Sequence, residues 1–174
     1  MIEKFKPDMY KQSVYDIDYK KLKKMGIKCL LFDLDNTIAP FDMEKPPRKL
    51  KDFIEKIKDM GFKIIIFSNA CKNRIRPFKN KLEVDCAASA KKPSKKKYKK
   101  VLAQYKYSEN EVAMIGDQIM TDILGGNKIG VLTILVDPIK QKEMFFTKIN
   151  RILEKRIMKK LKKKNLFSKG NYYD

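Results

Sequence analysis

The chain alternates short, wholly apolar runs with longer segments in which apolar residues recur every three or four positions. Runs of the first kind predict strands that are buried on both faces, as in a parallel sheet. Five such strands are predicted, at residues 29–32, 62–67, 84–88, 112–115 and 131–136. Segments with helical spacing lie between them, at residues 48–60, 93–105 and 119–127. This alternation predicts an α/β fold, a doubly wound, Rossmann-like parallel sheet of five strands with right-handed crossovers.

Polar side chains follow the ends of four of these strands. They are Asp33 and Asp35 after the first, Ser68 after the second, Lys92 after the third, and Asp117 and Asp122 after the fourth. In an open α/β sheet, ligands bind outside the carboxyl ends of the strands, so we expect these side chains at one edge. Taken alone, the segment from Asp33 to Asp35 is explained equally well by a polar strand end with an Asx-type turn. The other three strand ends favour a functional site.

The composition narrows the chemistry that such a site can perform. The chain of 174 residues has no histidine, which excludes histidine triads, histidine general bases and histidine metal ligands. Its three cysteines have no metal-binding spacing, and their odd number argues against a disulfide framework. Pro77 stands six residues after Cys71, where a tyrosine-phosphatase-type loop would need an anion-binding arginine. The groups that remain available for catalysis are carboxylates, lysines, hydroxyls and a hard metal ion.

In their order, the strand-end residues resemble the four motifs of the haloacid dehalogenase (HAD) superfamily of phosphatases. The matching segments are Asp33-Leu34-Asp35-Asn36-Thr37, Ser68, Lys92-Pro93, and Gly116-Asp117 with Asp122. The resemblance implies that Asp33 attacks phosphorus and forms an aspartyl-phosphate. It also implies that Asp35 protonates the leaving oxygen and later deprotonates the attacking water. Lys92 would pair with Asp33 and the phosphate, and Lys91 is the rival for that role.

The same resemblance implies Mg²⁺ as the cofactor, because a hard cation prefers oxygen ligands. The implied metal ligands are Asp33, Asp117 and the backbone carbonyl of Asp35. Asp122 would hold a metal-bound water or complete the ligand shell. Simple helix capping is the alternative explanation for Asp122.

Three further residues are expected to donate hydrogen bonds to the phosphoryl oxygens. They are Thr37 and Ser68 through their hydroxyls and Asn69 through its amide. For Ser68, a hydroxyl-mediated turn at the strand end is the alternative. Asn36 is expected to shape the turn that follows the first strand.

The spacing of the motifs bears on the kind of substrate. HAD enzymes usually carry a cap domain inserted after the first or the second motif. Here 30 residues separate Thr37 from Ser68 and 22 separate Asn69 from Lys92, so no cap fits either gap. A site without a cap cannot enclose a small metabolite. We therefore expect a phosphorylated macromolecule or a lipid headgroup as the substrate.

Positive charge is concentrated in two parts of the chain, whose net charge is +20. Residues 91–100 contain seven lysines and no acid, and residues 138–174 contain twelve lysines or arginines against three acids. We divide the chain into a capless phosphatase domain with an N-terminal extension at 1–137 and a basic amphipathic C-terminal helix and tail at 138–174. The apolar stripe of that helix, from Phe145 to Leu161, would lie either in a membrane interface or against the domain. Residues 162–174 are expected to be mobile.

The flanks resemble one capless branch of the superfamily, the YqeG-like proteins and the related mitochondrial phosphatidylglycerophosphate phosphatases. The segments that carry this resemblance are residues 5–10, 17–22, 26–27 and 147–151. The branch implies removal of the terminal phosphate of phosphatidylglycerophosphate, which yields phosphatidylglycerol. Its partners would be a glycerolipid headgroup and an anionic membrane surface.

Two other functions remain open from the sequence. A charge of +20 would also attract nucleic acid, so a phosphatase of nucleic-acid ends, such as a 3′-phosphatase, is one rival. A non-catalytic protein that binds polyanions or membranes is the other. The chain shows neither a signal-peptide core nor an apolar run of membrane-spanning length, which favours a cytoplasmic protein, peripheral at the inner face of the membrane. The oligomeric state stays open.

Overall fold

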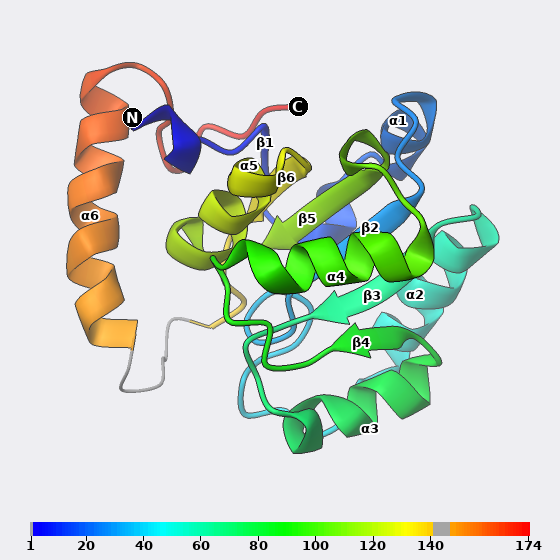
Figure 1. Ribbon diagram of the computed structural model, residues 1–174. Coiled ribbons are helices and arrows are strands. Elements are labelled where there is room, and N and C mark those ends of the chain that lie inside the picture. The colour runs from blue at the N-terminus through cyan, green and yellow to red at the C-terminus, as the bar shows by residue number, and fades with distance from the viewer. Residues whose placement is uncertain (1, 141–146) are drawn as a thin grey trace.

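The computed structural model describes residues 2–140 and 147–174 (Figure 1). At its centre is a six-stranded sheet with the strand order β1-β6-β5-β2-β3-β4, in which every neighbouring pair is parallel. The strands are β1 (Met9–Lys11), β2 (Cys29–Phe32), β3 (Lys63–Phe67), β4 (Asp85–Ala87), β5 (Val112–Gly116) and β6 (Leu132–Val136). The predicted doubly wound parallel sheet is confirmed, and β1 is a sixth strand that the sequence pattern did not predict.

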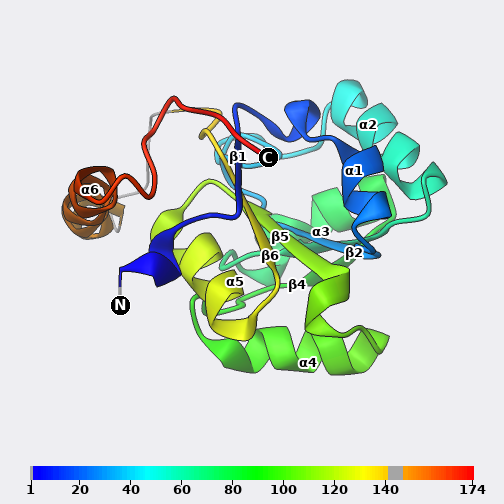
Figure 2. The same ribbon diagram turned by 90° about the horizontal axis from the view of Figure 1, so that it is seen from above.

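Helices cover both faces of the sheet (Figure 2). On one face lie α1 (Tyr19–Lys24), α2 (Arg48–Asp59) and α3 (Lys72–Leu82), and on the other lie α4 (Lys95–Tyr105) and α5 (Leu124–Ile129). Shorter turns are η1 (Glu3–Phe5), η2 (Val14–Asp16), η3 (Glu109–Glu111) and the π-helical turn η4 (Ile119–Ile123). The helices predicted at 48–60 and 93–105 are confirmed. The one predicted at 119–127 is divided between η4 and α5.

The central strand β2 shows why its sequence is apolar throughout. Leu30 and Phe32 pack towards α1, α2 and α3, whereas Cys29 and Leu31 pack towards α4. All four side chains are buried because helices cover the sheet on both sides. The polar residues therefore begin only where the strand leaves the core, at Asp33.

The two gaps between the motifs are filled by ordinary elements of the sheet domain. Residues 38–67 form a loop, α2 and β3, and residues 70–91 form α3, β4 and a second loop. In these two described ranges there is no inserted domain. The carboxyl edge of the sheet is therefore not covered by a cap of the kind that follows the first or second motif.

The two ends of the chain pack together at the β1 edge of the sheet. The Asp8 carboxylate accepts hydrogen bonds from the backbone N–H of Thr133 (2.8 Å) and from its hydroxyl (2.9 Å), which fixes the start of β1 beside β6. Tyr10 and Tyr173 exchange two backbone hydrogen bonds of 2.8 and 2.9 Å. Phe167 is buried against the Tyr10 ring, with 5.1 Å between ring centroids. The expectation that residues 162–174 are mobile is therefore wrong, because this tail covers the sheet edge.

Helix α6 (Thr147–Lys163) lies beyond the carboxyl ends of the strands, beside η4 (Figures 1 and 2). Its Leu161 is buried among Tyr10, Ile119 and Ile123, and the Ile119 N–H donates to the Glu154 carboxylate at 3.1 Å. The described end of α6 thus packs on the domain. Phe145 and Phe146, expected at the start of its apolar stripe, lie outside the described residues. None of the described helices combines the length and the apolar character needed to cross a membrane.

Candidate active site

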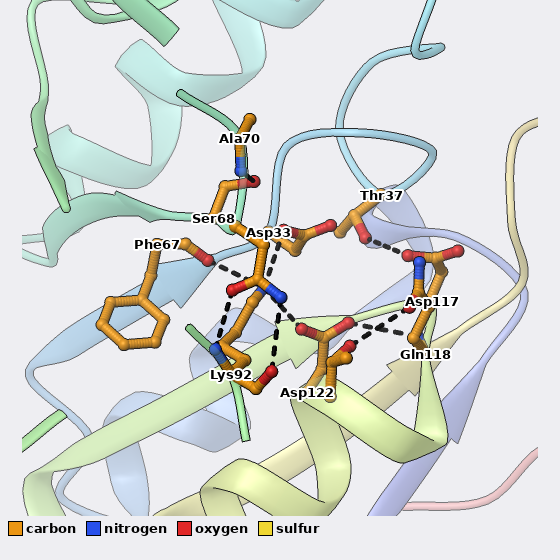
Figure 3. A network of polar contacts seen from close by, with 11 residues as sticks. Asp33, Thr37, Phe67, Ser68, Ala70, Lys92, Asp117, Gln118 and Asp122 are labelled. Atoms are coloured by element: carbon orange, nitrogen blue, oxygen red, sulfur yellow. Dashed lines mark hydrogen bonds and ion pairs between the residues drawn. The ribbon is translucent and has the colours of Figure 1, made fainter. Parts of the chain in front are cut away.

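The parallel sheet brings the predicted strand-end residues to one edge (Figure 3). Asp33 follows β2, Ser68 follows β3 and Asp117 follows β5, and these three strands are neighbours in the sheet. Lys92 reaches the same place from the loop before α4, and Asp122 reaches it from η4. Four segments that are remote in sequence therefore contribute to one polar cluster.

Lys92 lies at the centre of this cluster. Its Nζ donates to Asp33 Oδ1 at 2.7 Å, to Asp122 Oδ1 at 2.6 Å and to the Phe67 carbonyl at 3.0 Å. Only 2% of the Lys92 side chain is exposed. Burial acts to lower its pKa, but the Asp122 and Asp33 carboxylates outweigh that effect and raise the pKa above its usual value. Lys92 is therefore a fixed positive charge, whereas its rival Lys91 is exposed to solvent.

Three carboxylates converge beside Lys92. Asp33, Asp117 and Asp122 each place one oxygen so that all three lie within 4.8 Å of one another. Burial raises the pKa of Asp117 well above its usual range, and the charges of Asp33 and Asp122 raise it further. One lysine cannot neutralise three such groups. The oxygen donors and their mutual repulsion fit a divalent cation, which oxygen ligands bind well.

Asp122 makes a capping contact and also contacts Lys92. Its Oδ2 accepts a hydrogen bond from the Gln118 N–H at 3.1 Å, as in helix capping, while its Oδ1 contacts Lys92. The close approach requires glycine at position 116, because a Cβ there would lie 2.2 Å from Asp122 Oδ2. The Gly-Asp pair is thus explained by packing as well as by chemistry. Whether Asp122 holds a metal ion directly or through water stays a prediction.

Asp35 and Asn36 lie in the turn that follows β2. Asn36 has a φ of +64°, and its N–H donates to the Ala39 carbonyl at 2.7 Å, so the predicted turn is confirmed. The Asp35 carboxylate is not one of the three clustered carboxylates and pairs with Arg74 of α3, with 2.8 Å from Nη2 to Oδ1. Burial raises the pKa of Asp35, and the Arg74 guanidinium acts against that rise. Arg74 is a site residue that the sequence analysis missed.

The hydroxyls and the amide predicted to bind phosphate already have partners. The Thr37 hydroxyl donates to Asp117 Oδ1 at 3.1 Å, and Ser68 Oγ accepts from the Ala70 N–H at 3.2 Å, the bond expected of a strand-end turn. Asn69 is held by the backbone of Lys92: its Oδ1 accepts from the Lys92 N–H at 2.7 Å, and its Nδ2 donates to the Lys92 carbonyl at 3.3 Å. The Asn69 side chain therefore positions the lysine, and its role as a phosphate donor stays a prediction.

Comparison with known proteins also indicates a phosphatase. The family model described as mitochondrial PGP phosphatase matches residues 2–140. The Bacillus subtilis protein named probable phosphatase YqeG is 34% identical over 165 residues, which cover 94% of this chain and 96% of that protein. Phosphatidylglycerophosphate phosphatase 1, chloroplastic/mitochondrial, of Arabidopsis thaliana is 29% identical over 161 residues, 86% of this chain. The match covers 46% of that plant protein.

Solved structures with low sequence identity share the fold. A HAD-like family hydrolase from Porphyromonas gingivalis has a TM-score of 0.51 at 13% identity, covering 74% of this chain and 98% of that one. A cobalt-bound deoxy-D-mannose-octulosonate 8-phosphate phosphatase from Haemophilus influenzae has a TM-score of 0.50 at 14% identity, covering 80% and 94%. These likenesses concern architecture. The match of the family model over residues 2–140 and the 34% identity to YqeG show that the chain belongs to the mitochondrial PGP phosphatase family.

Proposed function

We propose that this phosphatase hydrolyses phosphate monoesters through an aspartyl-phosphate at Asp33, and that its substrate is phosphatidylglycerophosphate. The observation that carries the proposal is the buried contact between Lys92 and Asp33 beside the Asp117 and Asp122 carboxylates. A nucleophilic carboxylate and a fixed cation at one strand end match the needs of phosphoryl transfer, which depends on positioning and on charge neutralisation.

In the first half of the reaction, an Asp33 oxygen attacks phosphorus in line with the ester bond. The new bond joins Asp33 to phosphorus, and the bond from phosphorus to the ester oxygen breaks. Lys92, held by Asn69 and by two carboxylates, supplies a positive charge beside the phosphoryl oxygens. Thr37 and Ser68 add hydroxyl donors once the substrate competes for their present contacts.

Asp35 serves both halves of the reaction as the acid and then the base. As an acid, it gives a proton to the leaving alkoxide, so that an alcohol departs. It then takes a proton from a water molecule, which attacks phosphorus and releases inorganic phosphate. Asp33 is restored as a carboxylate, and Asp35 regains its proton. One side chain can do both because the two steps move a proton in opposite directions.

Mg²⁺ is the proposed cofactor, held by Asp33, Asp117 and the backbone carbonyl of Asp35, with Asp122 as a ligand or as the acceptor of a bound water. When bound, the ion supplies positive charge that neutralises the phosphate dianion and the acidic cluster. The fit rests on three oxygens within 4.8 Å and on the raised pKa of Asp117.

The substrate proposal rests on the relatives and on the open edge of the sheet. Two matching relatives are named for phosphatidylglycerophosphate, whose terminal phosphate is a monoester on a headgroup fixed to a bilayer. Because neither motif gap holds an inserted domain, a surface-bound headgroup can approach Asp33 without being enclosed. We place the enzyme at the cytoplasmic, anionic face of a membrane. The exposed basic side chains of α6 at this edge, Lys155, Arg156, Lys159 and Lys160, would favour that surface.

The proposal is tested by phosphate release from three substrates in the presence of Mg²⁺. They are phosphatidylglycerophosphate in mixed vesicles, a 3′-phosphorylated oligonucleotide and a soluble sugar phosphate. We expect the lipid to be hydrolysed with a kcat/KM at least about 100-fold above those of the other two, since remote binding energy raises the rate. Preference for the oligonucleotide would support the nucleic-acid rival instead.

The chemical step is tested with Asp33→Asn, which keeps the size of the side chain and removes the nucleophile. We expect phosphate release to fall by at least about 1,000-fold with unchanged folding. The matched control is Asp52→Asn, at a carboxylate on the outer surface of α2 whose side chain is 62% exposed. Full activity in Asp33→Asn would contradict the mechanism, and equal loss in the control would show that the assay reports stability.

A further inference from the structure

Arg74 connects helix α3 to the turn that carries Asp35. Its Nε and Nη2 donate to Asp35 Oδ1 at 3.0 and 2.8 Å. The other contacts of the guanidinium are with backbone carbonyls of the same turn and loop, Met43 from Nη1 at 2.7 Å and Pro40 from Nη2 at 3.2 Å. One side chain thus holds both the acid and the loop from residue 35 to residue 43.

This ion pair differs from an ordinary surface pair. Exposed lysine or arginine pairs with carboxylates contribute little, because solvent screens them and mobile side chains must be ordered. Here the Arg74 side chain is 20% exposed and that of Asp35 is 28% exposed. The guanidinium also stacks near the buried Phe78, with 4.8 Å from Cζ to the ring centroid. Four hydrogen bonds and an aromatic contact restrict the fork to one orientation.

The pairing is directed at one of the two Asp35 oxygens. Both guanidinium bonds end on Oδ1, so Oδ2 lies outside the contacts of Arg74. An acid–base carboxylate needs one oxygen to carry the proton and a fixed orientation to present it. A fork that grips Oδ1 from one side leaves Oδ2 to exchange a proton with the leaving oxygen and later with water.

Two carboxylates that are two residues apart in the chain are therefore each paired with a different cation. Lys92 holds Oδ1 of Asp33, and Arg74 holds Oδ1 of Asp35. Separate counter-ions from separate segments keep the nucleophile and the acid in different orientations, although their like charges repel. An arginine suits the second position because its planar fork fixes direction, whereas a lysine acts as a point charge.

We propose that Arg74 is a positioning residue that aims Oδ2 of Asp35 at the leaving oxygen and fixes the loop that carries it. The inference rests on the proposed role of Asp35 as the acid and base. It adds a residue that touches neither the substrate nor the phosphoryl group in this mechanism. Its four hydrogen bonds all go to Asp35 and to carbonyls of the loop that carries Asp35, so its role is exerted through Asp35.

The test compares two esters of similar size with different leaving groups, 4-nitrophenyl phosphate and benzyl phosphate. Nitrophenolate leaves without a proton, whereas the benzyl alkoxide needs one in the transition state. For Arg74→Met we expect kcat/KM to fall about 30-fold with benzyl phosphate and no more than about threefold with 4-nitrophenyl phosphate. A fall of about 30-fold is smaller than the full contribution of an acid–base group, because Asp35 itself is still present. Arg74→Lys should lie between this variant and the native chain. Arg76→Met, at an exposed arginine of the same helix, is the matched control and should change neither value.

Asp35→Asn separates this inference from the proposed function. It should show the same selective loss, larger in size, and adding Arg74→Met to it should cause no further selective loss, because Arg74 acts through Asp35. Equal losses with both esters, or none, in Arg74→Met would overturn the positioning role while leaving the role of Asp35 intact. If Asp35→Asn itself showed no selectivity between the esters, the proposed acid would be wrong. Should Arg74→Met fail to fold, the two kcat/KM values of Arg74→Lys decide by the same criterion.

Discussion

Lys92 and the lysines of α4 are close in sequence but have different surroundings. Lys92 is buried between Asp33 and Asp122, whereas Lys95, Lys96, Lys99 and Lys100 are exposed. A buried lysine with paired carboxylates acts at short range in a low dielectric, and exposed lysines act together through a field that salt screens. In the proposed mechanism the buried lysine serves the reaction at the carboxyl edge, whereas the exposed lysines would attract anions through that field. Burial and pairing, rather than composition, separate the two regions.

The largest effect is expected when the buried lysine is replaced and its exposed neighbour Lys91 is replaced separately. Lys92→Met leaves Asp33 and Asp122 without their shared cation, so we expect a loss of roughly 3–5 kcal/mol in unfolding free energy without metal. Phosphate release should fall by roughly 1,000-fold. Urea unfolding and hydrolysis of 4-nitrophenyl phosphate measure the two effects. Lys91→Met should change neither, and similar activities for both variants would refute the assignment of Lys92.

A second prediction concerns the space that the acidic cluster needs. Gly116→Ala would place a Cβ 2.2 Å from Asp122 Oδ2, so the carboxylate must move. We expect a loss of about 100-fold in kcat, because small displacements of reacting groups are costly, and about 2 kcal/mol in stability. Gly170→Ala is the control in the tail, where φ is +89° and no heavy atom lies within 4 Å of the added Cβ. It should cost about 1 kcal/mol from backbone strain and leave kcat unchanged.

Metal binding should stabilise the acidic cluster, and more so at high pH. The raised pKa of Asp117 means that the metal-free folded chain binds a proton there more tightly than the unfolded chain does. Its free energy of unfolding should therefore fall as pH rises through that raised pKa. At 100 times its Kd, Mg²⁺ should add about 2.7 kcal/mol, or about 5–10 °C in Tm. Thermal unfolding at pH 8 and pH 5, with and without Mg²⁺, tests this.

The matched variant for the metal experiment is Asp117→Asn. It removes the charge of one of the three clustered carboxylates, and with that charge it removes one source of repulsion. We expect a higher Tm without metal and a smaller increase with Mg²⁺ than in the native chain. A full Mg²⁺ response in this variant would place the ion elsewhere.

The smallest expected effect is on vesicle binding, and it should differ between the two basic helices α6 and α4. Helix α6 lies at the carboxyl edge, and α4 lies on a face of the sheet (Figure 1). Replacing Lys159 and Lys160 of α6 with glutamine should weaken binding to anionic vesicles by about 2 kcal/mol at low salt, near 1 kcal/mol for each charge. The same change at Lys99 and Lys100 of α4 should have less effect. Vesicle sedimentation over a salt series measures both, and a stronger effect from α4 would reverse the proposed orientation.

The packed tail explains why substitutions suit this last test better than truncation. Leu161 and Phe167 are buried against Tyr10, and Tyr173 pairs with the β1 backbone. Removing residues after Pro138 would expose this apolar surface and free the edge of the sheet. Any loss of vesicle binding would then be mixed with a loss of folding. Changing exposed lysines leaves the packing intact.

Most of the sheet could be predicted because its strands are buried on both faces and are therefore wholly apolar. The short strand β1 could not, since Met9–Lys11 has three residues and takes its place from contacts with Thr133 and Tyr173. Helix α3 was also missed. Its apolar positions are few, and Pro77 lies inside it, so its sequence does not show a clear helical period. Both elements are defined by what they pack against.

The candidate site divides in the same way. The motif residues were recognisable because each follows an apolar run, and parallel strands necessarily end at one edge. Arg74 gave no such signal, as one of 41 lysines and arginines in the chain. The contact between the Asn69 side chain and the Lys92 backbone could not be predicted either, because the two residues are 23 positions apart in the chain.

Local pattern was thus enough for the α/β architecture, the absence of an inserted cap and the residue types available for phosphoryl transfer. These follow from the period of apolar residues and from the distances between motifs along the chain. Folding in three dimensions settled which lysine is buried, where the Asp35 carboxylate points and how the C-terminal tail covers β1. Such properties depend on contacts between segments remote in sequence, and the order of residues alone does not encode them in a form that can be read locally.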